Sequence, residues 1–388
     1  MKVLISGGGI AGSAAALFLA RDGHAVSVID KAESFQPLGY MLSLKSFGLR
    51  IMQELGLLAA LKQHELSYSV FQFRYPDDHL IQEYLEPIVR AVTRGELFTY
   101  RSALHRVLYE AASRAVGIRF GLEIASLTER ESGIEVTLSD GSEDAFDIVV
   151  VAEGLRSSTR HLLWGDKGLE PLDLDYHAAT IEHSHGFAAG TMTTYSGPGT
   201  MLLCFPITPE RLVIQSYLRA RPGAGADRQA VRRLLLDAHA GYAPRLKGMI
   251  ESLRPEDYVF HDGIAMVDLP ALTRGRVALL GDAGYCPTFM SGMGASLALL
   301  GAKLLARSLA PRALAADHAL AQYDAAIRPT VRHYQDNARR NAQALVPKSW
   351  LKWVALNWLL HVTPPETAVR RFGKQFEVES SLLEALEH

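Results

Sequence analysis

A glycine-rich turn between a short apolar strand and a helix is the feature that most restricts how this chain folds. The residue pattern predicts a strand from Lys2 to Ser6, a helix from Ile10 to Arg21 and a second strand from Ala25 to Ile29. The turn carries G-x-G-x-x-G at Gly7, Gly9 and Gly12, and Asp30 follows Gly12 by 18 residues. This βαβ unit is predicted to hold a dinucleotide, with the pyrophosphate at the helix N-terminus and Asp30 at a ribose hydroxyl.

Two later segments also look like buried strands followed by a glycine and a polar turn, Asp147 to Ala152 and Arg276 to Gly281. They predict parallel strands that deliver loops to one edge of a sheet. Between them, Gly190 to Arg219 alternates aromatic, β-branched and polar residues, which predicts an antiparallel sheet that Ser69 to Tyr84 extends. Asp227 to Leu253 and Leu314 to Leu345 are predicted helices.

The glycine fingerprint alone does not distinguish FAD from NAD, but two further motifs do, the loop after Gly281 and the turn from Glu153 to Arg160. Asp282 follows a predicted core strand, and Gly292-Met293-Gly294-Ala295 opens an apolar helix ten residues later. A carboxylate at a strand end can bind a ribityl hydroxyl, and unpaired amides at a helix N-terminus can stabilise negative charge on a reduced flavin ring. A third polar turn, Glu153 to Arg160, follows the strand that ends at Ala152.

With these three motifs in this order, the chain resembles the class A flavoprotein monooxygenases, the family of p-hydroxybenzoate hydroxylase, which includes aromatic hydroxylases and tetracycline-inactivating enzymes. The resemblance covers nearly the whole chain. It implies an α/β fold with a Rossmann-like FAD-binding domain, an interleaved substrate domain on an antiparallel sheet, and a C-terminal helical segment. The expected FAD-binding domain is 1–68, 100–167 and 268–345, the substrate domain 69–99 and 168–267, and the helical segment 346–388.

The resemblance also implies a set of residues that bind FAD without a covalent link. Arg101 matches the arginine that contacts FAD from the start of a helix, and Glu153 stands where the family has an aspartate. Tyr285 and Cys286-Pro287-Thr288 replace a common histidine and paired prolines. We expect Asp282 to act mainly in FAD binding, and Glu153 and Arg160 mainly in flavin reduction. The full expected set is Gly7, Gly9, Ile10, Ala11, Gly12, Asp30, Lys31, Arg101, Glu153, Arg160, Gly281, Asp282, Gly292, Gly294 and Ala295.

By this resemblance the protein is an oxidoreductase that uses NADPH or NADH as a transient co-substrate and molecular oxygen to hydroxylate a small aromatic or polyketide-like substrate. The oxygen would be transferred from a flavin C4a-hydroperoxide, so that no side chain is named as a catalytic base. The expected pocket residues are Met192, Thr194, Met201, Phe205, Gln215 and Tyr217. The alternatives are an FAD-dependent oxidase or dehydrogenase on the same scaffold, and a non-catalytic flavin-binding redox sensor.

Composition excludes several other classes. A formal net charge of −2 argues against a nucleic-acid partner. Cys204 and Cys286 are the only cysteines, and His183 and His185 lack further ligands, so no metal site is predicted. A strand beginning at Lys2 leaves no room for an export signal, and no apolar stretch reaches the roughly 20 residues of a membrane span. We therefore expect a cytoplasmic protein. Trp350, Trp353, Asn357 and His361 share one predicted helical face, which we expect to pack against the cofactor domain rather than lie on a membrane surface.

Overall fold

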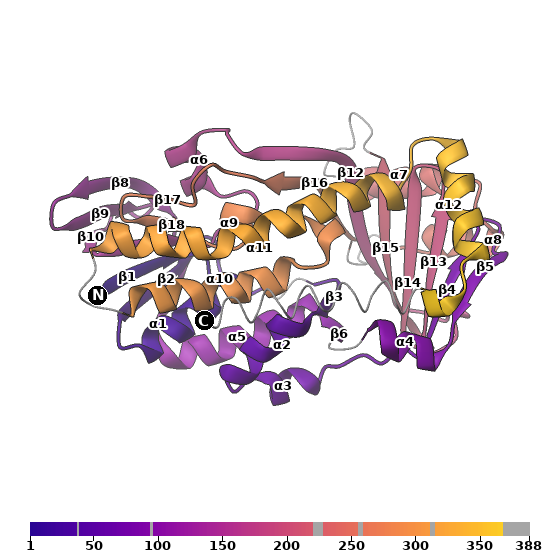
Figure 1. The fold of residues 1–388 in the computed structure, drawn as a ribbon, viewed down its shortest axis with the longest axis horizontal. Coiled ribbons are helices and arrows are strands. Elements are labelled where there is room, and N and C mark those ends of the chain that lie inside the picture. Colours follow the sequence, from indigo (N-terminus) through magenta and orange to yellow (C-terminus); the bar gives the residue numbers. More distant parts are fainter. Residues whose placement is uncertain (37–38, 94–95, 220–227, 255–258, 311–314, 368–388) are drawn as a thin grey trace.

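The computed structural model describes residues 1–36, 39–93, 96–219, 228–254, 259–310 and 315–367 of the chain. They form an elongated molecule with a large sheet toward each end (Figure 1). One sheet is parallel and flanked by helices, and the other is mainly antiparallel. The predicted α/β fold, with an antiparallel second sheet and a C-terminal helix, is therefore confirmed.

The parallel sheet contains the predicted βαβ unit. Within the described residues its strand order is β17-β18-β11-β1-β2-β7, and every neighbouring pair is parallel except β17 with β18. The carboxyl ends of β1, β11 and β18 consequently meet at one edge, where a doubly wound sheet binds ligands. The strands are β1 (Lys2–Ser6), β2 (Ala25–Asp30), β7 (Ile118–Phe120), β11 (Ile148–Val151), β17 (Thr273–Arg274) and β18 (Val277–Leu279).

The two faces of this sheet enter different hydrophobic cores, because successive side chains of a strand point to opposite faces. Val3 and Ile5 pack beneath helices, whereas Leu4 packs against a small antiparallel sheet. The helices on the first face are α1 (Ile10–Arg21), α2 (Ser46–Glu54), α3 (Leu58–Lys62), α5 (Arg101–Ala115) and α10 (Gly294–Leu309). The small sheet consists of β8 (Ile124–Arg130), β9 (Gly133–Leu138) and β10 (Glu143–Phe146).

The second large sheet has the order β16-β12-β15-β14-β13-β4-β5 in the described part of the chain. Helices α7 (Arg228–Ala238) and α8 (Pro244–Glu251) cover one face, and the other face is directed to α4 (Glu86–Val92) and a two-stranded sheet of β3 (Met41–Leu44) and β6 (Leu97–Tyr100). The strands are β4 (Val70–Arg74), β5 (Leu80–Tyr84), β12 (Leu169–Ile181), β13 (Thr191–Gly197), β14 (Thr200–Thr208), β15 (Arg211–Arg219) and β16 (Val259–Val267).

Sequence patterns located most of these elements but merged or missed some. The predicted helix from Asp227 to Leu253 is two helices, since Pro244 lacks the amide hydrogen that a helix interior requires and instead begins α8. Strands β12 and β16 were not predicted. Residues 227 and 314, where two predicted helices began, lie outside the described residues, and the domain boundaries stay a prediction.

The long helix α11 (Ala316–Leu345) runs along the molecule and contacts both lobes (Figure 1). At its C-terminal end the Arg219 guanidinium donates to the carbonyls of Ala342 and Val346, both at 2.7 Å. A cation at this position complements the negative end of the helix dipole. The second sheet is thereby attached to a helix whose other end packs on the cofactor lobe.

The C-terminal helix α12 (Trp350–Val362) corrects one prediction, because it packs on the second sheet and not on the cofactor lobe. The Trp353 indole donates to the Ser196 carbonyl at 3.0 Å, and His361 Nδ1 lies 3.0 Å from the Ile81 carbonyl. Asn357 is buried between them, whereas Trp350 is 61% exposed. Residues 368–388 of the expected helical segment lie outside the described residues. No helix in the described part of the chain is long and apolar enough to cross a membrane.

Candidate cofactor and substrate site

The glycine turn after β1 has the shape that a pyrophosphate requires. Gly7 has φ +105°, and a Cβ there would lie 2.3 Å from the Ala152 carbonyl oxygen. At Gly12 a Cβ would lie 1.8 Å from the Gly7 oxygen, so this glycine allows α1 to approach the turn. At Gly9, by contrast, no other atom lies within 4 Å of the Cβ position. The middle glycine therefore faces open space at the N-terminus of α1, which has no side-chain cap.

Asp30 at the end of β2 accepts hydrogen bonds from the amides of Gly8 at 2.8 Å and Ala32 at 2.9 Å. The carboxylate is thus fixed beside the turn, and each oxygen keeps a lone pair for a ribose hydroxyl. Lys31 next to it is exposed. Ile10 and Ala11 are buried in the first turn of α1.

His105 is a site residue that sequence reasoning missed. Its Nε2 lies 3.0 Å from the Gly8 carbonyl oxygen, and its Nδ1 is buried with no hydrogen-bond partner in the described structure. Burial lowers its pKa, which favours the neutral ring. His105 follows Arg101 by one turn of α5, so both side chains lie on the same side of the helix. This spacing was the one sequence feature that could have predicted that His105 lies near the cofactor turn.

Glu153 replaces the family's aspartate without loss of hydrogen bonding. Oε1 accepts from Ser6 Oγ at 2.5 Å and Thr159 Oγ1 at 2.6 Å. Oε2 accepts from Ser157 Oγ at 2.6 Å and from the Thr159 amide at 3.0 Å. The carboxylate thus joins the end of β1, immediately before Gly7, to the start of α6 (Ser158–Trp164).

Arg160 is 6% exposed and connects the Glu153 turn to the Gly281-Asp282 loop. Its guanidinium donates to the carbonyls of Leu155 at 2.7 Å and Ala283 at 3.1 Å. Burial lowers its pKa, an effect opposed by the nearby Cys286 and Glu153. The second and third motifs are therefore in direct contact.

The Gly281-Asp282 loop lies against the first motif. Gly281 has φ +63°, and a Cβ there would lie 2.8 Å from the Ala11 methyl group. Burial raises the pKa of Asp282, which the positive charge of Arg101 and a hydrogen bond from Cys286 oppose. Arg101, at the start of α5, therefore lies close to Asp282, and its guanidinium carbon is 6.0 Å from the centre of the Tyr40 ring.

The segment after Asp282 forms α9 (Asp282–Tyr285) and a 3-10 turn, η1 (Phe289–Ser291), before α10 begins at Gly294. Gly292 is left-handed at φ +64°, and α10 has no side-chain cap on its first amides. A Cβ on Gly294 would lie 3.8 Å from Asp282 Oδ1. The N-terminus of α10, with Ala295 in its first turn, thus lies beside the Asp282 carboxylate, an arrangement suited to a flavin's pyrimidine edge.

Tyr285, at the family's usual histidine position, points away from this edge. It is 1% exposed, and its hydroxyl lies 3.4 Å from the Tyr323 hydroxyl. A Cβ on Gly301 of α10 would lie 1.8 Å from the same hydroxyl. Tyr285 is therefore a core residue between helices.

All six predicted pocket residues lie on one face of the second sheet. The strand register places Thr194 opposite Leu203, Met201 opposite Tyr217 and Gln215 opposite Leu203, and Met192 and Phe205 each lie two residues further along the same strands. Residues that pair directly share a face. Gln215 Nε2 donates to the Met41 carbonyl at 2.9 Å, so this face is directed to β3 of the cofactor lobe.

Aromatic rings join this face to η1. Tyr176 of β12 stacks on Phe289 with ring centres 4.2 Å apart and an angle of 16°. Tyr40 contacts both rings edge-on, at 5.3 and 5.0 Å. Tyr217 lies 5.1 Å from Tyr176. The segment between Asp282 and Gly292 is thus in direct contact with the aromatic side of the second sheet.

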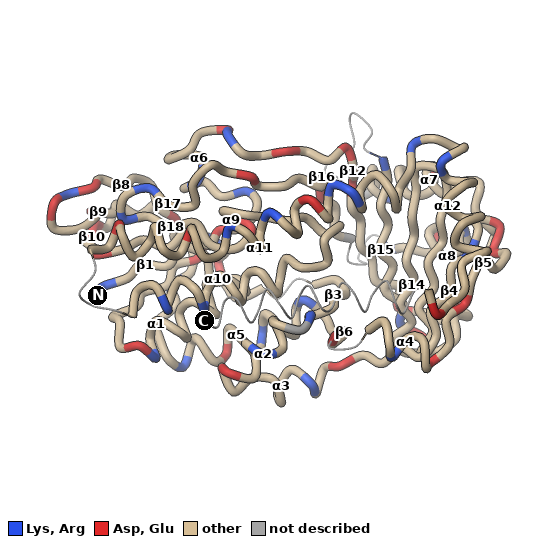
Figure 2. The backbone as a smooth tube through the Cα atoms, in the orientation of Figure 1, with Lys and Arg blue, Asp and Glu red and all other residues tan. Residues whose placement is uncertain are grey.

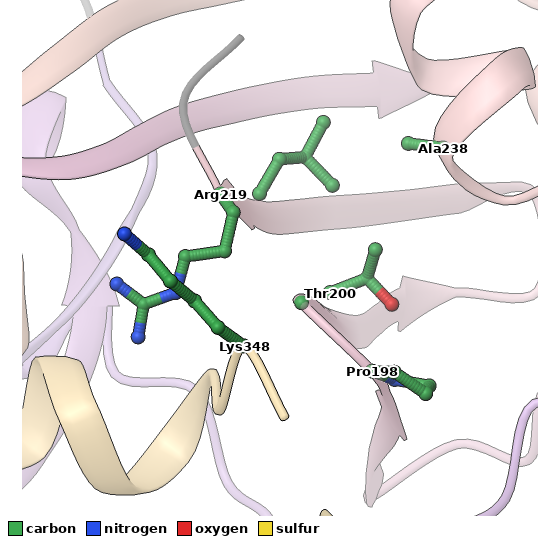
Figure 3. Close-up of a pocket in the computed structure, with 7 residues that line it drawn as sticks. Pro198, Thr200, Arg219, Ala238 and Lys348 are labelled. Atoms are coloured by element: carbon green, nitrogen blue, oxygen red, sulfur yellow. The ribbon is translucent and has the colours of Figure 1, made fainter. Parts of the chain in front are cut away.

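A separate cavity of about 210 Å³ lies where β14 begins and β15 ends (Figure 3). Its wall includes Pro198, Thr200, Arg219, Ala238 and Lys348. Arg219 already donates to two α11 carbonyls, and Lys348 pairs with Asp173 at 3.3 Å. This cavity has no contact with the three motifs, and we do not assign it to the reaction.

The residues at the motif edge fit FAD. The space above Gly9, the unpartnered Nδ1 of His105, the fixed Asp30 carboxylate and the uncapped start of α10 each offer a group that a dinucleotide flavin would use. The described residues contain no cluster of three His, Cys, Asp or Glu side chains that could hold a metal ion. His183 and His185 instead contact Ser252 Oγ and the Thr208 carbonyl. Acidic and basic residues are interspersed over both lobes (Figure 2).

Comparison with known proteins agrees with this fold. A family model described as an FAD binding domain matches residues 1–338. The FAD-dependent monooxygenase asL6 of Sarocladium schorii is 30% identical over 367 residues, covering 87% of this chain and 86% of the relative. Klebsiella pneumoniae HpxO, solved with FAD and uric acid, superposes with a TM-score of 0.84 at 23% identity, covering 96% of this chain and 95% of that one. The tetracycline destructase Tet(51) superposes with a TM-score of 0.74 at 20% identity, covering 93% and 96%. The two structural likenesses concern the fold.

Proposed function

The chain belongs to the FAD binding domain family and is an FAD-dependent monooxygenase, and we propose that it uses NADPH or NADH and oxygen to hydroxylate a small aromatic or polyketide-like compound. One observation carries the proposal. The aromatic face of the second sheet stacks directly on η1, which lies between Asp282 and the start of α10. A substrate held on that face would lie beside the cofactor edge that these residues form.

The residues of the first lobe would hold FAD along its whole length. The N-terminus of α1 would face the pyrophosphate at Gly9, and Asp30 would accept from a ribose hydroxyl. Asp282 and Arg101 would bind the ribityl chain and the phosphates, and the amides of Gly294 and Ala295 would stabilise negative charge at the pyrimidine edge. Bound FAD would supply hydride acceptance from NAD(P)H and the activation of oxygen for transfer to the substrate.

The second lobe would position the substrate and exclude water from the reaction. Tyr176, Tyr217 and Phe289 close the boundary between the lobes with apolar ring surface. Water exclusion is the established requirement for oxygen transfer in competition with release of peroxide. We also propose a cytoplasmic location, since Cys204 and Cys286 are free and buried, as suits a reducing compartment.

The test is a sequence of three measurements on purified protein. FAD titration of the apo-protein gives the affinity, and anaerobic stopped-flow mixing with NADPH or NADH gives the rate of flavin reduction. Mass spectrometry with ¹⁸O₂ then shows whether oxygen enters the product of an aromatic compound that stimulates NAD(P)H consumption. A bound flavin that neither nucleotide reduces would refute the proposal and favour a redox sensor. Reduction by the organic compound itself would favour an oxidase or dehydrogenase.

A further inference from the structure

Four polar groups on the substrate face lack hydrogen-bond partners among the described residues. Gln215 is 5% exposed, and because its Nε2 donates to the Met41 carbonyl, its Oε1 is left as an acceptor with no donor among the described residues. Tyr217 is 8% exposed, and its hydroxyl likewise has no partner within the described ranges. The hydroxyls of Tyr68 and Tyr100 are buried without partners at the Phe205 end of the same face.

The buried hydroxyls of Tyr68 and Tyr100 need an explanation, because native structures leave few buried polar atoms unpaired and each costs about 1–3 kcal/mol. These four follow one line across the face. Tyr217 lies next to η1, Gln215 is two residues along β15, and Val213, which packs with Tyr68 and Tyr100, is two further. At about 3.4 Å per strand residue, the line from Tyr217 to Val213 covers about 14 Å. That length exceeds a single benzene ring.

On the described strands, the middle of this face carries no charged side chain. The two arginines of β15 that share its side lie at the strand ends, and both are engaged, Arg211 by Glu182 at 2.9 Å and Arg219 by two carbonyls. The charged residue of β16 that shares this side is Asp262, an acid that pairs with Arg156. A carboxylate substrate placed here would meet no available cation on the described strands of the sheet, because Arg101 beside Tyr40 is assigned to the cofactor, and it would have to lose its hydration.

Resting on the proposed function, we propose that the substrate is an uncharged compound of two or more fused aromatic rings with hydroxyl or carbonyl groups at its edge, and that Gln215 and Tyr217 select it. The Gln215 oxygen accepts from a substrate hydroxyl in the middle of the face. The Tyr217 hydroxyl bonds an oxygen substituent next to η1. The partly exposed rings of Phe260 and Phe289, backed by the buried Tyr176, supply apolar contact around it.

The test measures binding to the oxidised holo-protein through perturbation of the flavin absorbance bands. The probes are a matched pair, 2,3-dihydroxynaphthalene and 3-hydroxy-2-naphthoate, with catechol as the single-ring comparison. We expect dihydroxynaphthalene to bind at least 50-fold more tightly than the naphthoate and at least 10-fold more tightly than catechol. Equal or tighter binding of the naphthoate would overturn the inference that the substrate is uncharged.

Variants test the two selecting residues. Gln215→Met conserves volume, and Tyr217→Phe conserves the ring, so both should retain FAD, and each should weaken dihydroxynaphthalene binding about 5- to 20-fold. Ser216→Ala is the matched control, since Ser216 is equally buried on the same strand but contacts His239 on the opposite face. Unchanged binding by both variants, or an equal loss with Ser216→Ala, would overturn the assignment. If NADPH reduces the flavin but no fused-ring compound binds, this inference fails while the proposed function stands.

Discussion

Replacement of Glu153 should damage the fold and the cofactor turn together. In Glu153→Ala the hydroxyls of Ser6, Ser157 and Thr159 and the Thr159 amide all lose their acceptor. The hydroxyls can rotate to other acceptors, but the amide cannot. If two of the four donors stay unpaired, at about 1.5–2 kcal/mol each, the free energy of unfolding of the apo-protein falls by about 3–4 kcal/mol. FAD affinity should fall about 10-fold, because Ser6 directly precedes Gly7.

Glu153→Gln is the informative comparison. The amide oxygen of the glutamine can occupy the position of Oε2 and accept from the Thr159 amide. Its NH₂ group would then occupy the position of Oε1, where the hydroxyls of Ser6 and Thr159 can rotate to accept hydrogen bonds from it. We expect a loss of only about 1 kcal/mol and nearly normal FAD affinity. This geometry makes stability the first consequence of changing Glu153, ahead of the selective effect on flavin reduction that its motif predicts.

Urea unfolding of the apo-proteins, FAD titration and anaerobic reduction by NADPH together decide the matter. Asp282→Asn is the control, since it should lower FAD affinity without a comparable loss of apo-protein stability. A free energy of unfolding of Glu153→Ala within about 0.5 kcal/mol of the parent, which is about the error of such measurements, would contradict this prediction. Equal instability of the Gln and Ala variants would contradict it as well.

Three more predictions follow from contacts of single residues. Gly9→Val should abolish FAD binding, because the valine side chain would fill the open space above the turn where the pyrophosphate would lie. The circular dichroism of the apo-protein should not change, since the side chain meets no other atom there. Retained FAD affinity would contradict this prediction. Burial, assisted by neighbouring His261 and His239, lowers the pKa of His177 to about 3, and burial lowers that of His239 to about 4. Below pH 6.5 the unfolded chain therefore binds more protons than the folded chain, and the free energy of unfolding should fall by about 1.4 kcal/mol per pH unit for each histidine between pH 6 and 4.5. His177→Gln should reduce that slope in denaturant titrations at a series of pH values. An identical slope would refute the assignment. Trp353→Ala should release α12 to limited proteolysis, since it loses the Ser196 hydrogen bond and the contact with Tyr75, whereas the exposed Trp350→Ala should be cleaved no faster than the parent.

The parts of the site that sequence predicted are those with local causes. The turn at Gly7 to Gly12 follows from a strand, a tight turn and a helix in immediate succession, and Asp282 follows from the strand before it. The six pocket residues share a face because alternation along a strand is itself local, although their contact with substrate stays a prediction.

What sequence did not predict depends on distant partners. Ser6 meets Glu153 across 147 residues, and Gln215 meets Met41 across 174. His105 acquires its position only when α5 packs against the glycine turn. The prediction that α12 packs on the cofactor lobe was wrong. Apolar residues occupy both the buried and the exposed side of α12, so the hydrophobic periodicity does not specify which side packs against the rest of the protein.

The order of strands in the parallel sheet has a consequence for synthesis on the ribosome. β11, whose four residues are Ile148-Val149-Val150-Val151, stays a bare sheet edge until β18 emerges, and β18 is translated only after the entire second sheet. At 5–20 residues per second this delay is on the order of ten seconds. During that interval a nascent chain exposes an apolar edge able to pair with another chain. Translation rate and chaperone access over the stretch from β12 to β16 should therefore govern the yield of active enzyme more strongly than they do elsewhere in the gene.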